Sequence, residues 1–284
     1  MPAKIANPYS LVDTAWVEAH LSDPQVKLVQ VDEYLDAYEA RHLPGAVNWD
    51  WTSHLNDTVN RNMLGKDGFQ RLMSECGITR QTRVVLYGDS SSWFAVYAFW
   101  LLTMYGHVRV SLMDGGSAKW AAEGRPRSNE PPASVRLRQY RARAPDLTHR
   151  ATRGYVLETL REKSRIGIVD VRSPKEYSGE LIAPAHLAQE GAQRGGHIPT
   201  AVSVPWDRAI DPGDGTIKSV AELSDLYGSL GITADTETIV YCRIGERAAH
   251  TWFVLSQVLG HPKVRNYDGS WVEWGSMVGA PIER

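Results

Sequence analysis

The residues best suited to chemistry form one short run, C-R-I-G-E-R at positions 242–247. An apolar segment that is expected to be a strand, 238–241, comes before it, and a helical pattern begins near Arg247. Backbone N–H groups at a helix N-terminus and two neighbouring guanidinium groups favour a thiolate over a thiol. We therefore expect the pKa of Cys242 to be lowered and its sulfur to act as a nucleophile. The alternative is a buried cysteine that only packs at the end of a strand.

The sequence contains an internal repeat. Residues 77–120 align with residues 231–274 without a gap. Residues shared by both copies are expected to serve the fold, whereas residues present in one copy are better candidates for chemistry. The counterpart of Cys242 is Gly88, so the first copy keeps the pattern and lacks the nucleophile.

A repeat of this length is the size of a domain, so we expect two homologous domains in tandem. We place a catalytically inactive domain at residues 1–130 and an active domain at residues 151–284. Residues 131–150, in a stretch rich in Pro and Arg, are expected to be the linker. The second domain carries an insertion, 178–196, which is expected to form either a lip over the site or a plain surface loop.

Strands alternate with helices in both copies. The expected strands are 27–31, 83–87, 108–113, 166–171, 238–241 and 264–267, and the expected helices are 67–75, 92–105, 118–123, 220–230, 247–259 and a last one from 271. This alternation predicts an α/β fold in which each domain has a parallel sheet flanked by helices. Sites in such sheets form at the carboxyl ends of strands, where Cys242 is placed.

Composition and charge argue against several other classes of protein. The net charge is −2, with 31 basic and 33 acidic residues mixed along the chain, so we expect no binding of nucleic acid and no membrane-binding face. Residues 1–12 lack the apolar core of a signal peptide, and no segment approaches the ~18 apolar residues of a membrane span. We expect a cytoplasmic protein. Cys76 and Cys242 occupy unmatched positions of the repeat, so a structural disulfide is not expected.

Four motifs follow one another along the second copy. Asp170 and Arg172 end a strand, G-H-I-P follows at 196–199, the cysteine loop is next, and D-G-S-W closes the set at 268–271. This set resembles the tandem-domain rhodaneses, or thiosulfate sulfurtransferases, over nearly the whole chain. The C-R-x-G start of the loop is similar to the thiosulfate type, and the full C-R-I-G-E-R run is similar to the actinobacterial members. The resemblance implies an active C-terminal domain, an inactive N-terminal domain and a site where the two domains meet.

The resemblance also implies sulfur transfer through Cys242, with no metal and no organic cofactor. A thiolate would attack the outer sulfur of thiosulfate, sulfite would leave, and a cysteine persulfide would remain. Cyanide or a thiol, including the thiol of a thioredoxin-like protein, would then remove the sulfur in a ping-pong cycle. Loop N–H groups and the helix dipole would stabilise the persulfide anion.

The other loop residues are candidates for substrate binding. Arg243 and Arg247 are placed to bind the sulfonate oxygens and to offset charge on the leaving sulfite. Gly245 is expected to take a positive φ, which would turn successive N–H groups inward, and Ile244 belongs to the same binding loop. The Glu246 carboxylate should repel an anion unless it pairs with one of the arginines or points outward.

Asp170 and Arg172 are candidates to support the loop. Asp170 has a counterpart in the first copy, Asp32, which favours a structural role. Arg172 aligns with Tyr34 of the first copy and is therefore specific to the second, so we count it among the candidate substrate-binding residues. It is expected either to form an ion pair that supports the site or to be a solvated surface charge.

Three other functions compete with this interpretation. A cysteine phosphatase needs its arginine six positions after the cysteine, whereas Arg247 comes one residue early. A 3-mercaptopyruvate sulfurtransferase typically has Gly after the cysteine, and Arg243 departs from that pattern. A non-catalytic sulfur-relay module would keep the fold and use Cys242 only to accept a persulfide from a protein partner. Vertebrate rhodaneses carry basic residues near the position of Glu176 and in place of Ile244, so the preferred donor is left open.

Overall fold

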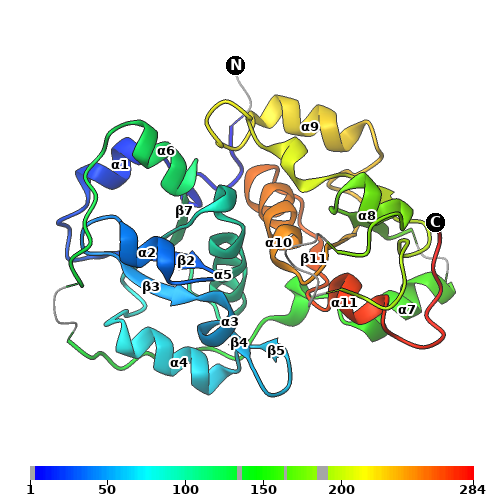
Figure 1. Ribbon diagram of the computed structural model, residues 1–284, viewed down its shortest axis with the longest axis horizontal. Helices are drawn as coiled ribbons and strands as arrows, with labels where there is room; N and C mark the ends of the chain where they lie inside the picture. Colours follow the sequence, from blue (N-terminus) through cyan, green and yellow to red (C-terminus); the bar gives the residue numbers. More distant parts are fainter. Residues whose placement is uncertain (1–3, 133–135, 163–164, 184–190) are drawn as a thin grey trace. The chain divides into compact units, whose positions relative to one another are not determined.

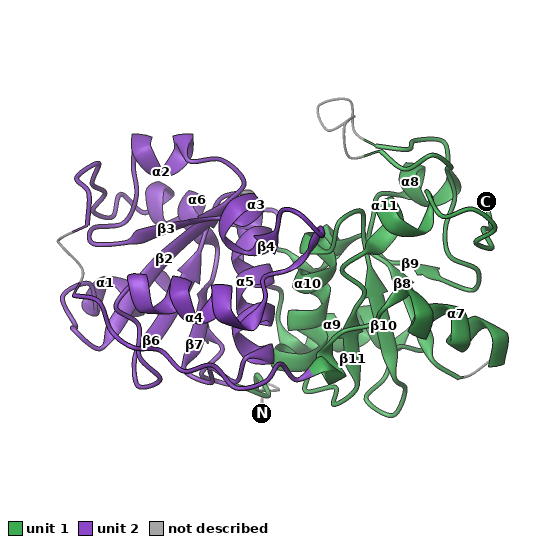
Figure 2. Cartoon of the chain, turned by 90° about the horizontal axis from the view of Figure 1, so that it is seen from below, with its two compact units in different colours: residues 1–7, 147–210, 218–284 green, residues 8–146, 211–217 purple. Residues whose placement is uncertain are grey.

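The computed structural model describes residues 4–132, 136–162, 165–183 and 191–284. Within them the chain forms two compact units (Figure 2). The N-terminal unit contains residues 8–146 and 211–217, and the C-terminal unit contains residues 4–7, 147–210 and 218–284. Each unit has its own sheet, so the fold of each can be followed separately.

The N-terminal unit is built on a five-stranded sheet in the order β1-β7-β6-β2-β3, and every pairing in that sheet is parallel. Its strands are β1 (Leu11–Val12), β2 (Val26–Asp32), β3 (Val47–Asp50), β6 (Arg83–Tyr87) and β7 (Val110–Met113). Its helices, which flank the sheet in Figure 1, are α1 (Thr14–Ala19), α2 (Asp36–Ala40), α3 (Trp51–His54), α4 (Lys66–Glu75), α5 (Trp93–Met104) and α6 (Gly116–Ala122). A short antiparallel pair joins β4 (Asn56–Asp57) to β5 (Asn62–Met63).

The C-terminal unit repeats this plan on a four-stranded sheet in the order β11-β10-β8-β9, again with parallel pairings. Its strands are β8 (Gly167–Asp170), β9 (Val202–Ser203), β10 (Thr238–Tyr241) and β11 (Val264–Asn266). Its helices are α7 (Arg153–Glu162), α8 (Pro174–Ser178), α9 (Val220–Gly228), α10 (Glu246–Phe253) and α11 (Ser270–Trp274). The predicted fold of two tandem α/β domains with parallel, helix-flanked sheets is confirmed.

Two segments group with the unit that does not contain the rest of their copy. At the chain start, Ala6 N–H donates to the carbonyl of Val258 at 3.0 Å, within the C-terminal unit. Residues 211–217 group with the N-terminal unit, where Lys119 Nζ lies 2.7 Å from Asp214 Oδ2. Each of these two segments therefore belongs to a different unit from the one in which the repeat would place it.

The stretch expected to be a linker also packs within the N-terminal unit. Tyr140 is buried, its ring meets Phe69 of α4 edge-on, and its N–H donates to Ser74 Oγ at 3.0 Å. Residues 141–143 alternate between exposed arginines and the buried Ala142, as an extended segment with one solvated face does. Arg141 and Arg143 therefore lie on the solvated side of this extended segment.

A buried tyrosine ties the carboxyl ends of neighbouring strands together in the C-terminal unit. The Tyr241 hydroxyl, at the end of β10, donates to Asp170 Oδ2 at 2.7 Å and accepts from Ile198 N–H at 3.0 Å. In the N-terminal unit the hydroxyl of Tyr87, the repeat counterpart, accepts from Leu43 N–H at 3.1 Å. A residue shared by both copies thus serves the fold, as the repeat predicts.

The elements next to the cysteine lie where the sequence predicts them. Strand β10 coincides with the expected strand, and α10 begins at Glu246, continuing into a π-helical turn at Val254–Val258. Among the described residues, no helix is both long and apolar enough to cross a lipid bilayer.

Candidate functional site

The candidate site is the loop that joins β10 to α10. Cys242 follows the strand directly, and Gly245 stands at the N-cap of the helix with φ of +105°. A Cβ on Gly245 would lie 2.8 Å from Asp268 Cα, so glycine is required for both its backbone angle and its space. This turn brings Gly245 N–H to 3.1 Å from Cys242 Sγ, which accepts the hydrogen bond. The inward-turned N–H that the sequence predicts is present.

The turn between β11 and α11 holds the loop from the other side. Cys242 N–H donates to Ser270 Oγ at 3.1 Å, and its carbonyl accepts from Trp271 N–H at 3.0 Å. The Asn266 side-chain amide donates to the Gly245 carbonyl at 3.1 Å. The D-G-S-W motif therefore acts as a backbone clamp on the cysteine. The motif itself could be recognised in the sequence, but the contacts of Ser270 and Asn266 with the cysteine loop could not be predicted from it.

The thiol of Cys242 is fully buried and donates to a carboxylate. Cys242 Sγ lies 3.3 Å from Glu246 Oε2. Burial and the charge of Glu246 raise the pKa of Cys242 to about 11, although Arg247 and the N–H groups of Ala248 and Gly245 act in the opposite direction. The prediction of a lowered pKa is therefore wrong for this state of the loop. Two facts that the sequence did not show are responsible: the thiol is completely desolvated, and Glu246 turns back toward the sulfur.

Glu246 pairs with both arginines, which is one of the alternatives that the sequence left open. Its Oε1 lies 3.5 Å from Arg247 Nε and 3.9 Å from Arg243 Nη2. Arg247 also binds Glu176 of α8, with Nη1 to Oε2 at 3.3 Å and Nη2 to Oε1 at 3.2 Å. All four side chains are almost completely buried. A buried network of two cations and two carboxylates, whose formal charges cancel, therefore contacts the cysteine through Glu246.

Glu176 is the site residue whose contact with the loop sequence reasoning missed. It closes a capping box with Ser173, whose hydroxyl and N–H donate to Glu176 Oε2 at 2.8 and 3.1 Å. Burial alone would raise the pKa of Glu176, but the Arg247 guanidinium and the Ser173 donors outweigh it and lower that pKa. The S-P-x-E pattern at 173–176 signals a helix start, and nothing in it indicates the second partner.

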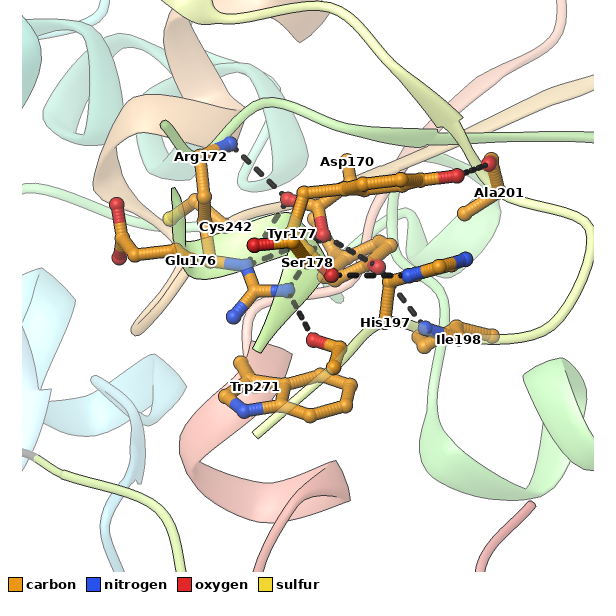
Figure 3. A network of polar contacts seen from close by, with 12 residues as sticks. Asp170, Arg172, Glu176, Tyr177, Ser178, His197, Ile198, Ala201, Cys242 and Trp271 are labelled. Carbon is orange, nitrogen blue, oxygen red and sulfur yellow. Dashed lines mark hydrogen bonds and ion pairs between the residues drawn. The ribbon is translucent and has the colours of Figure 1, made fainter. Parts of the chain in front are cut away.

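Arg172 and Asp170 form a buried ion pair that supports the loop (Figure 3). Arg172 Nη2 lies 2.6 Å from Asp170 Oδ2 and donates to the Gly196 carbonyl at 2.7 Å. Its guanidinium stacks on the Trp271 ring, with its central carbon 4.5 Å from the ring centroid. Of the two alternatives for Arg172, the ion pair is observed and the solvated charge is not. Because Trp271 also binds the Cys242 carbonyl, this stack positions the loop; contact between Arg172 and substrate stays a prediction.

The insertion is anchored at its C-terminal end. Arg194 donates to the carbonyls of Met277 and Ala280 at 2.6 and 3.0 Å, and its own carbonyl accepts from Trp271 Nε1 at 3.0 Å. The expected lip over the site falls partly on residues 184–190, which lie outside the described residues. Ile244 is buried together with the rest of the loop, and its part in substrate binding stays a prediction.

The N-terminal unit has the same loop scaffold without the thiol. Gly88 stands at the position of Cys242, and its carbonyl accepts from Ser117 N–H at 3.0 Å, as the Cys242 carbonyl accepts from Trp271. Asp32, the counterpart of Asp170, accepts from Asp89 N–H and from Gln30 Nε2, both at 2.8 Å, whereas Asp170 accepts from Arg172. Across the described residues, no group of three or more His, Cys, Asp or Glu side chains is arranged to hold a metal ion.

Comparison with known proteins identifies the family to which this fold belongs. Residues 13–123 and 153–277 each match the family model described as "Rhodanese-like domain". The chain belongs to the rhodanese family. The two matches fall on the two copies of the sequence repeat, so both copies are rhodanese domains, and the cysteine loop lies in the second.

Relatives of this tandem rhodanese cover nearly its whole length. A Mycobacterium bovis protein named "Putative thiosulfate sulfurtransferase 1" is 50% identical over 273 residues, covering 96% of this chain and 97% of that one. The "Sulfur carrier protein TtuD" of Thermus thermophilus is 48% identical over 281 residues, covering 98% of each chain. Among solved structures, an anaerobic ergothioneine biosynthesis enzyme from Chlorobium limicola has a TM-score of 0.85 at 23% identity, over 99% of this chain and 71% of that one. This last similarity shows the fold alone.

Proposed function

We propose that this rhodanese is a thiosulfate sulfurtransferase that carries sulfur as a persulfide on Cys242. One observation carries the proposal: Cys242 directly follows the buried strand β10, and its sulfur accepts a hydrogen bond from Gly245 N–H. The sulfur also contacts Glu246, whose carboxylate pairs with Arg243 and Arg247. The names of the relatives, a thiosulfate sulfurtransferase and a sulfur carrier, support the same chemistry.

In the first half-reaction, Cys242 loses its proton and attacks the outer sulfur of thiosulfate. The new S–S bond forms as the old one breaks, the bonding electrons leave with sulfite, and the persulfide remains on Cys242. Arg243 and Arg247 bind the sulfonate oxygens and offset the charge on the departing sulfite. The Gly245 N–H and the start of α10 stabilise the negative persulfide that remains.

In the second half-reaction, a thiophile attacks the outer sulfur of the persulfide. Cyanide leaves with it as thiocyanate, a small thiol or a thioredoxin-like protein leaves as its own persulfide, and Cys242 is regenerated. This cycle needs no cofactor. We place it in the cytoplasm, where the two free cysteines of the chain stay reduced.

A sulfur relay is the second candidate, and the charge balance of the site favours it. Arg247 is already bound by Glu176 and Glu246, so a dianion such as thiosulfate must compete with two carboxylates. A persulfide presented by another protein carries less charge and needs no such competition. The relative named as a sulfur carrier is consistent with this role.

A comparison of donors tests the assignment. The full-length protein is given thiosulfate, 3-mercaptopyruvate or a persulfidated donor protein, and thiocyanate is measured after cyanide is added. The proposed function predicts the highest kcat/KM with thiosulfate, and no product from Cys242→Ser. Turnover only with mercaptopyruvate would assign the sister activity, and turnover only with the protein donor would assign the relay.

A further inference from the structure

We propose that Glu246 accepts the proton of Cys242 during sulfur uptake and returns it to the departing sulfite. The proposal deepens the proposed function and rests on it, because it assigns the proton step of the same reaction. Its basis is the contact of the thiol with Glu246 Oε2 at 3.3 Å, in a place where both side chains are buried. A proton that leaves this sulfur has a carboxylate within reach and little access to water.

The two oxygens of Glu246 have separate partners. Oε1 faces the guanidinium groups of Arg247 and Arg243, at 3.5 and 3.9 Å. Oε2 faces the sulfur of Cys242. A residue that only neutralised the arginines would not need its second oxygen on the reacting atom. The orientation observed is that of a base bound to its nucleophile.

The other titratable groups nearby are less suited to the proton step. The groups around the pair are Arg243 and Arg247 from the loop and α10, Glu176 from α8, Asp268 with Arg150 beside Gly245, and His250 on the next turn of α10. Glu176 is bound by Arg247 and Ser173, and Asp268 by Arg150. His250 packs against Trp206, and burial lowers its pKa to about 4, which makes it a weak base.

The step balances as follows. The Cys242 thiol, the Glu246 carboxylate and thiosulfate become a persulfide anion, a carboxylic acid and sulfite. The acid then protonates sulfite, which leaves as bisulfite, and the carboxylate is restored. The negative charge of the arriving substrate favours the transfer, because it repels the Glu246 carboxylate and is itself drawn to the two arginines. The carboxylate that should repel an anion thus becomes neutral when the anion is bound.

The variant Glu246→Gln separates this role from a purely electrostatic one, because the two predict opposite results. If Glu246 were only a negative charge beside the thiol, its removal would make Cys242 easier to ionise and sulfur uptake at neutral pH would become faster. If Glu246 is the proton acceptor, uptake at neutral pH slows by about 10²-fold, the usual size of a general-base effect. The rate in the variant should then rise with pH as hydroxide or direct ionisation replaces the carboxylate.

The experiment uses the full-length protein and follows sulfite release in a single turnover with thiosulfate, over a range of pH. Glu246→Asp, which keeps the carboxylate on a shorter side chain, should fall between the wild type and Glu246→Gln and keep the wild-type pH profile. Glu176→Gln removes a carboxylate from the same arginine without touching the sulfur, so it should not acquire the steep pH dependence. A Glu246→Gln variant as fast as the wild type at neutral pH would overturn the proposal.

A second electrophile distinguishes failure of this proposal from failure of the proposed function. Iodoacetamide is neutral and needs no arginine, and its reaction at Cys242 is measured by mass spectrometry in the same variants. The proton-acceptor role predicts slower alkylation of Glu246→Gln than of the wild type at neutral pH, whether or not thiosulfate reacts. A wild type that releases no sulfite would refute the thiosulfate function, and faster alkylation of Glu246→Gln would refute the proton-acceptor role.

Discussion

The carboxylate of Glu176 lies across the guanidinium of Arg247, with the two nitrogen–oxygen pairs at 3.2 and 3.3 Å. The same carboxylate caps α8 through Ser173. Arg247, which the sequence predicts to bind the substrate, is therefore already paired with a carboxylate in the protein without substrate. We propose that anion binding at this site is a competition between the substrate and Glu176, and that the strength of this competition sets the affinity for the donor.

Glu176→Gln should tighten the binding of thiosulfate. The amide keeps an oxygen for the Ser173 cap and withdraws the charge that competes for Arg247, so we expect the KM for thiosulfate to fall by about tenfold, the worth of one charge-assisted hydrogen bond. Steady-state thiocyanate formation measures it. Glu180→Gln is the matched control, because that carboxylate is exposed and pairs with the exposed Lys175. Equal KM values in the two variants would contradict the competition.

Arg247→Ala should weaken both sulfur uptake and the fold. The variant leaves Glu176 and Glu246 buried without their shared cation, which typically costs about 3–5 kcal/mol of the free energy of unfolding. Urea unfolding at neutral pH measures the loss, and the double variant with Glu176→Gln should recover part of it. A double variant no more stable than Arg247→Ala would show that the Glu176–Arg247 pair is not responsible.

The stability difference between the wild type and Arg247→Ala should also depend on pH. Burial would raise the pKa of Glu176, but Arg247 outweighs it and lowers that pKa in the folded protein. The stabilisation from this pair is therefore present above the unfolded-state pKa of glutamate, about 4.3, and is lost as the pH falls through the lower folded value. We expect the two unfolding curves to approach each other in acid. Curves that stay equally far apart down to acid pH would argue against the pair as the source.

Gly245→Ala should abolish sulfur uptake. A Cβ there would lie 2.8 Å from Asp268 Cα at a φ of +105°, so the loop must shift and the N–H bonded to Cys242 Sγ moves with it. Gly279→Ala is the control, because Gly279 also has a positive φ, +78°, but nothing lies within 4 Å of its Cβ position. We expect Gly279→Ala to lose about 1 kcal/mol of stability and keep its sulfur uptake. Normal uptake by Gly245→Ala would contradict the loop geometry.

Arg172→Met distinguishes loop support from substrate contact. The methionine removes the ion pair with Asp170 and keeps part of the packing on Trp271, so we expect a loss of about 3 kcal/mol in stability. Because Trp271 binds the Cys242 carbonyl, kcat should fall while the KM for thiosulfate changes little. A large rise in KM with an unchanged kcat would instead show that Arg172 binds the donor.

Much of this account could be predicted from the sequence. Apolar runs followed by a reactive or charged residue predicted β8 and β10. The repeat showed that Cys242 is present in the second copy alone, and Gly245 predicted the tight turn. These features are local, because a strand, a glycine turn and a helix start are each specified by a few neighbouring residues. For that reason they can be predicted from the sequence alone.

What could not be predicted was the direction of buried side chains. Glu246 points back to the sulfur, Arg172 folds onto Asp170 and Trp271, and Glu176 reaches Arg247 from a helix far away in the sequence. The contacts of Arg172 with Trp271 and of Glu176 with Arg247 depend on how separate elements pack. Glu246 lies only four residues after Cys242, but the spacing does not fix the direction of its side chain. The pKa of Cys242 was predicted in the wrong direction because the N–H groups were visible in the sequence, while the desolvation and the orientation of Glu246 were not.

The most direct test of the central claim is the intact mass of the full-length protein after incubation with thiosulfate and removal of the excess. The account predicts a gain of one sulfur on the wild type and on Cys76→Ser, no gain on Cys242→Ser, and loss of the added sulfur on treatment with cyanide as an equal amount of thiocyanate appears. A wild type that gains no sulfur, or a Cys242→Ser variant that gains it, would contradict the persulfide on Cys242.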